Sequence, residues 1–233
     1  MIPFVPLVLV LHTILGAVLA DVSHGSDAQV TVRLIRRCGS PAACLPRAVV
    51  DGVRAEAEHI WSSLDVRVVW IDSVDAASSA AADADMTVVL EETAAAPDAG
   101  ATPAAVRLAA MRQPDVPCGP GFARVWVTNA RRHAAGVRIH GTALEQLPNA
   151  FADIVLTRML GRALAHEIGH YLLGTKDHSP FGLMRARFVP REMAYPPGEA
   201  LYGLDSRLRR ALQLRPCGSE VGSLGHHAHG ERD

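Results

Sequence analysis

The segment Asn149–Leu173 restricts the fold of this chain more than any other. Its sequence, NAFADIVLTRMLGRALAHEIGHYLL, carries apolar residues on nearly every side of a helical period, with no broad polar stripe. This pattern predicts a long helix buried in the middle of a domain. Gly174 can take the left-handed conformation that ends such a helix. The rest of the domain must therefore pack around a helix that also carries His166, Glu167 and His170.

These three polar residues form an H-E-x-x-H motif. Histidines four residues apart lie on one helical face, so His166 and His170 can both reach one zinc ion, while Glu167 is offset and can hold a water molecule. Such a motif also arises by chance, in helices whose histidines bond to each other or to nearby carbonyls. Two imidazoles and a carboxylate on a buried apolar helix are costly without a shared charge partner, which favours zinc.

The third ligand is predicted to be His178. It follows His170 by eight residues, a rise of about 12 Å if the helix continued, so it reaches the metal only if the chain reverses at Gly174. Water would then fill the fourth position of a tetrahedral site. Two acidic residues remain as alternative third ligands, Asp177 and Glu192.

The sequence HEIGHYLLGTKDHSPFGLM resembles the metzincin metallopeptidases, and among them the matrixin-like group. Their motif is H-E-x-x-H-x-x-G-x-x-H, often followed by Ser and then by a tight turn with a Met beneath the metal. Gly174, His178, Ser179 and Met184 have counterparts here, with one extra residue before the glycine and one more before the third histidine. The segment also looks like that of exported bacterial proteins with HE-x-GH-x-LLG followed by H-S-x-x-G-x-M.

The resemblance implies an α+β fold. Its parts are a metzincin-like twisted mixed sheet with a long helix, a central active-site helix, a Met-turn at Met184 and a C-terminal helix near residues 204–214, within a domain spanning residues 28–217. It also implies a zinc-dependent endopeptidase in which Glu167 assists a zinc-bound water. The tyrosine that helps some metzincins two residues after the Met is Ala186 here, and Tyr195 or Tyr202 could substitute. The alternative is a catalytically inactive zinc-binding protein of the same fold, acting as a binding module.

Hydrophobic periodicity predicts the remaining elements. Alternation of apolar and polar residues indicates strands, and three- and four-residue steps after Pro46 indicate a helix. Strands that alternate with helices favour a mixed sheet with helices packed against it. The predicted strands are 29–36, 66–71, 86–90 and 122–128, and the predicted helix is 47–64.

The expected partner is a peptide or protein substrate. A metzincin cleft binds an extended peptide along a sheet edge, for which Phe122–Thr128 is the candidate, and Arg185–Pro197 would shape a neighbouring pocket. Arg185 and Arg187 could contact carboxylates there. A formal net charge of −1 gives no electrostatic reason to bind nucleic acid, and we expect a monomer.

The N-terminal residues 1–20 contain no charged side chain and predict a signal peptide cleaved after Ala20, with a retained anchor as the alternative. We therefore expect a secreted or periplasmic protein that is not membrane-bound after cleavage. The tail 218–233 is rich in Gly, Ser and His and is predicted to be flexible. Its histidines could bind metal loosely, and they are His226, His227 and His229.

An even number of cysteines in an exported chain predicts disulfides. We expect Cys38 to pair with Cys44 and Cys118 with Cys217, although four cysteines allow three connectivities. The segment 37–41, RCGSP, also resembles the cysteine switch of matrixins, which holds zinc through a thiolate. It lies between a strand and a helix and not in a propeptide, so a disulfide is the favoured interpretation.

Overall fold

A five-stranded sheet forms one layer of the fold. The computed structural model describes residues 28–40, 44–72, 84–93, 107–116, 118–196 and 199–214. The sheet has the order β2-β1-β3-β5-β4. All neighbours are parallel except β4 and β5, which are antiparallel. The strands are β1 (Ala28–Arg37), β2 (Val66–Asp72), β3 (Met86–Glu91), β4 (Ala109–Arg112) and β5 (Gly121–Trp126).

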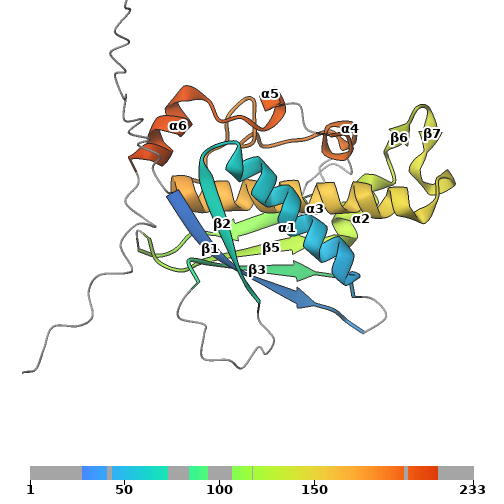
Figure 1. The fold of residues 1–233 in the computed structure, drawn as a ribbon, viewed down its shortest axis with the longest axis horizontal. Helices are drawn as coiled ribbons and strands as arrows, with labels where there is room; N and C mark the ends of the chain where they lie inside the picture. Colours follow the sequence, from blue (N-terminus) through green and yellow to red (C-terminus); the bar gives the residue numbers. More distant parts are fainter. Residues whose placement is uncertain are drawn as a thin grey trace, which may run out of the picture.

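Two long helices form the second layer. Helices α1 (Arg47–Ser62) and α3 (Asn149–Leu173) lie side by side across one face of the sheet (Figure 1). The Trp61 indole of α1 is fully buried and donates a hydrogen bond of 3.0 Å to the Ala165 carbonyl of α3. Most of α3 is buried from Val155 onward, which agrees with its apolar residues on all sides.

The C-terminal elements cover the other side of α3. Figure 1 shows α4 and α6 on the side of α3 opposite the sheet, and both pack against this helix. Arg162 of α3 is fully buried there, with Nε 2.6 Å from the Glu56 carboxylate of α1. Its Nη1 also donates to the Glu192 carbonyl of α4 at 2.8 Å. The elements after α3 are α4 (Pro190–Ala194), α5 (Glu199–Tyr202) and α6 (Ser206–Gln213).

The expected mixed sheet with packed helices is confirmed, and the sheet is mostly parallel. Each predicted strand and long helix has an observed counterpart within a few residues, except at the end of the fourth strand. That strand ends at Trp126, and residues 127–134 form a helix that the sequence analysis missed. Six other described elements were not predicted. They are β4, the hairpin strands β6 (Arg138–Ile139) and β7 (Thr142–Ala143), the short 3-10 helix η3 (Leu144–Gln146), and the short helices α4 and α5. The missed helix is α2 (Val127–Ala134).

The proposed peptide-binding edge at Phe122–Thr128 was therefore wrong. Strand β5 pairs with β3 on one side and with β4 on the other, so it is an interior strand. Among the described strands, the edge next to β5 belongs to β4, whose sequence AAMR lacks the alternation that identifies a strand.

The Cys38–Cys44 disulfide is confirmed. Cys217, the signal-peptide segment 1–20 and the tail 218–233 lie outside the described residues. The second disulfide, the cleavage after Ala20 and the flexible tail therefore stay predictions. Within the described ranges, no helix has both the length and the apolar character needed to cross a membrane.

Candidate metal centre

The end of helix α3 brings three histidines together. Gly174 adopts φ 61° and ψ 26°, the left-handed conformation that ends the helix and reverses the chain. The loop then returns His178 to the helix face that carries His166 and His170. One ring nitrogen from each lies within 4.8 Å of the others. This is the spacing that a single metal ion requires, and His178 lies on the solvent side of the group.

Backbone carbonyls set the orientation of two of these rings. Nδ1 of His166 lies 2.7 Å from the Leu183 carbonyl, and Nδ1 of His170 lies 2.8 Å from the Thr175 carbonyl. A carbonyl oxygen only accepts, so Nδ1 carries the proton and Nε2 keeps its lone pair. Burial lowers the pKa of His166 to about 4 and also lowers that of His170, so both rings are neutral at pH 7. Neutral imidazoles with a free Nε2 are the form that binds zinc.

Glu167 is buried beside these rings, with 4% of its surface exposed. Within the described part of the chain, no hydrogen-bond partner reaches its Oε2. Burial raises the pKa of this carboxyl to about 8, an effect that the charge of Arg107 only partly opposes. A buried carboxylate of this kind is costly unless a cation lies near it.

Met184 lies beneath the helix. Its side chain is fully buried, and a Cβ added to Gly169 would collide with its sulfur. The loop that carries His178 is tied to this turn, because Ser179 N donates to the Met184 carbonyl at 2.8 Å. The turn therefore packs against α3 and holds the segment of the third histidine.

The alternative acidic ligands lie outside the histidine group. The Glu192 carboxylate forms an ion pair with Arg185 at 3.0 Å and accepts a hydrogen bond from the backbone N–H of Val189. Both of its partners are in the segment that follows Met184. Asp177 is exposed. Arg185 is committed to the same ion pair, which weighs against its expected role as a contact for substrate carboxylates.

Neither candidate tyrosine has a hydroxyl free for catalysis. The Tyr195 hydroxyl donates to the Arg138 carbonyl at 3.1 Å, and the Tyr202 hydroxyl donates to the Glu192 carbonyl at 2.9 Å. Tyr202 also packs against Phe188, whose ring lies 6.1 Å from that of His166. Phe188 therefore lies beside His166, and Tyr202 packs against the ring of Phe188.

The residues present fit a zinc ion. Three imidazoles can supply three nitrogen donors to one zinc ion and leave its fourth position open. The unpartnered oxygen of Glu167 lies on the same helix, where it would otherwise be an unexplained buried polar atom.

Several residues that fix the three histidines could not be identified from the sequence. Gln113 donates to a backbone carbonyl, and Leu183 and Thr175 accept through their own backbone carbonyls. No sequence motif indicates such contacts. Phe188 is an ordinary aromatic residue in sequence, and only the fold brings it to His166.

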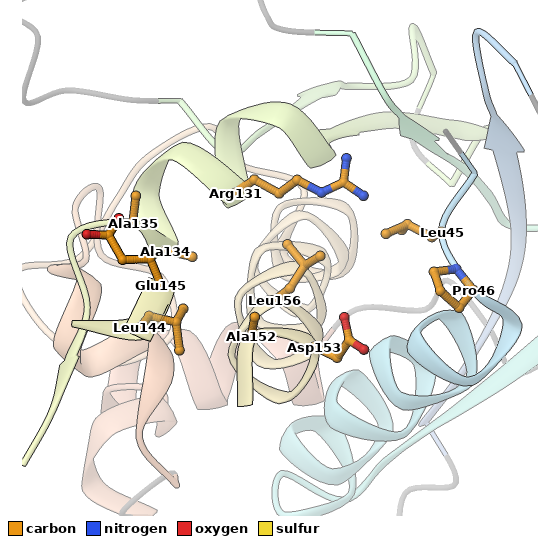
Figure 2. Close-up of a pocket in the computed structure, with 10 residues that line it drawn as sticks. All are labelled: Leu45, Pro46, Arg131, Ala134, Ala135, Leu144, Glu145, Ala152, Asp153 and Leu156. Atoms are coloured by element: carbon orange, nitrogen blue, oxygen red, sulfur yellow. The ribbon is translucent and has the colours of Figure 1, made fainter. Parts of the chain in front are cut away.

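A separate cavity of about 270 Å³ lies near the first turns of α3 (Figure 2). Its lining includes apolar Leu45, Leu144 and Leu156 and charged Arg131 and Asp153. Leu156 precedes His166 by ten residues, about 15 Å along the helix, so this cavity is distinct from the histidine group.

No family model matches the chain, and no curated protein sequence matches it. Among solved structures, the chain is similar to the crystal structure of archaemetzincin from Methanopyrus kandleri. The two share 15% sequence identity with a TM-score of 0.40, over 82% of this chain and 97% of that chain. Because identity and TM-score are both low, the assignment of a metal site depends on this chain's own side chains.

Proposed function

We propose that this protein is a zinc-dependent endopeptidase of the metzincin type, with His166, His170 and His178 as ligands. The observation that carries the proposal is the convergence of three imidazole nitrogens beside a buried glutamate. Two of the rings have Nδ1 fixed on a carbonyl, which is the usual support of a zinc ligand.

Glu167 acts as the proton carrier in this proposal. Zinc, when bound, supplies positive charge that polarises a carbonyl, lowers the pKa of water to about 7 and favours the ionised form of Glu167. The Glu167 carboxylate accepts the proton of the attacking water and then delivers it to the leaving amine. Its burial excludes solvent from that proton transfer. The inactive alternative has no need of a buried base beside its ligands.

The substrate is an extended peptide paired with strand β4. Among the described strands, β4 pairs only with β5, so the backbone groups of its other edge are able to accept another strand. Gln113 follows the strand directly and bonds to the end of α3, which brings this edge to the histidine group. We further propose that the protein acts outside the cytoplasm, since the Cys38–Cys44 disulfide persists in oxidising compartments.

The test combines metal binding with peptide cleavage. We expect about one zinc per chain in the protein lacking the tail 218–233, and cleavage within a mixed peptide library. Glu167→Gln should keep the zinc and lose at least about 100-fold in rate, because general acid–base catalysis contributes 10²–10⁴-fold. His178→Ala should lose zinc, whereas Asp177→Ala, a matched change at an adjacent exposed position, should not.

Two results would contradict the proposal. Zinc binding without any cleavage that depends on Glu167 would favour the inactive binding module. Zinc binding that is unaffected by His178→Ala would remove the assigned third ligand and return Asp177 and Glu192 to consideration.

A further inference from the structure

Gln113 joins the edge of the sheet to the end of the active-site helix. It follows β4 directly, and its Nε2 donates to the His170 carbonyl at 2.9 Å and to the Thr175 carbonyl at 3.0 Å. A primary amide has two N–H donors, so these contacts use both of them. Gln113 is partly buried. Its two acceptors lie far from it in sequence, His170 by 57 residues and Thr175 by 62 residues.

Gln113 supplies a donor that the end of α3 lacks. The His170 carbonyl is in the last turn of α3, where carbonyls lack the usual helical partner. Gly174 N, which would complete that turn, donates to the Tyr171 carbonyl instead. The amide of Gln113 therefore satisfies one of the groups that the helix end leaves unpaired.

Thr175 is the point at which Gln113 acts on the metal ligands. Its carbonyl accepts from Gln113 and from Nδ1 of His170, so the direction of this one oxygen sets the orientation of the imidazole. Its hydroxyl accepts from Asp177 N at 3.0 Å, which fixes the loop just before His178. Fixing Thr175 thus constrains two of the three histidines. His166 is outside this arrangement, because its Nδ1 bonds to Leu183.

We propose that Gln113 is a positioning residue of the metal centre, which holds Thr175 and thereby His170 and couples strand β4 to metal binding. This inference rests on the proposed zinc site. Hydrogen-bond partners of a ligating histidine typically contribute 10–100-fold to metal affinity. Because Gln113 acts one contact further out, we expect an effect at the lower end, about 10-fold.

The experiment measures zinc affinity by chelator competition and hydrogen exchange of β4, with no activity assay. Gln113→Leu removes both donors, and Gln113→Met is the second variant if Leu impairs folding. Gln146→Leu is the matched control, because Gln146 is exposed on η3. Wild type should bind zinc about 10-fold more tightly than either Gln113 variant, and the control should equal wild type.

Hydrogen exchange separates positioning from a general loss of stability. In the wild type, zinc should slow amide exchange in Ala109–Arg112, because the metal orders His170, Thr175 and Gln113 together. In the Gln113 variants zinc should still slow exchange at the end of α3 but no longer in β4. The proposal is overturned if the folded variants bind zinc as tightly as the wild type, or keep zinc-dependent protection of β4. A wild type that binds no zinc would instead refute the proposed function itself.

Discussion

Replacing Glu167 by Gln should make the metal-free protein more stable, by an amount that increases with pH. The carboxyl has a pKa of about 8 in the fold against an ordinary value of 4.5, so the folded state binds its proton more tightly than the unfolded chain does. Stability from this group is fully present below pH 4.5 and is lost as the pH rises through 8. Gln cannot titrate and therefore avoids this loss.

The magnitude follows from the shift in pKa. With about 1.36 kcal/mol per pKa unit, the difference in unfolding free energy between Glu167→Gln and wild type should grow by about 2.5 kcal/mol between about pH 5 and pH 7. His166 has the opposite sign, because its lowered pKa contributes stability that is lost as pH falls from 6.5 toward 4. That contribution is present in both proteins and cancels in the difference.

Urea unfolding in the presence of a chelator measures this difference at each pH. A difference that stays constant between pH 5 and 7 would refute the reasoning, because the carboxyl would then have an ordinary pKa. Adding zinc should reduce or reverse the pH dependence of this difference in unfolding free energy, because a nearby cation favours the ionised form of the Glu167 carboxylate.

Two further substitutions test the packing around the site. Gly169→Ala drives a methyl group into the Met184 sulfur and should lower the free energy of unfolding by about 1–3 kcal/mol in a urea titration; unchanged stability would show that the turn is not packed there. Arg162→Met leaves the Glu56 carboxylate without its buried partner and should cost about 3–5 kcal/mol by the same measurement. Adding Glu56→Gln to that variant should recover part of the loss, and equal stability of the single and double variants would contradict this explanation.

The long helix and its motif could be predicted because their signal is local. Apolar residues on all sides of Asn149–Leu173 require burial, and the four-residue spacing of His166 and His170 fixes one face whatever surrounds the helix. The reversal at Gly174 was also open to prediction, because only a few residues tolerate positive φ.

The sheet edge could not be predicted, because edge position is a tertiary property. Strand β4 has four residues without alternation, and it forms a strand because β5 offers it an antiparallel partner. The sequence therefore indicated β5, with its clear alternation, as the candidate edge. Helix α2 was missed for a related reason, since Val127 and Thr128 favour strands and the helix forms only where the chain leaves the sheet.

The supporting contacts of the histidines were equally hidden from the sequence. The acceptors are the carbonyls of Leu183 and Thr175, which every residue carries, so their identity has no sequence signal. Arg185 shows the opposite case: a conspicuous charged residue suggested a substrate contact, but the fold pairs it with Glu192.

The most direct test of the central claim is a crystal structure of the zinc-loaded protein, with anomalous scattering recorded on both sides of the zinc absorption edge. We predict one strong zinc peak at about 2.0–2.1 Å from Nε2 of His166, Nε2 of His170 and a ring nitrogen of His178. A peak that lies elsewhere, or that replaces His178 with a carboxylate, would contradict the account.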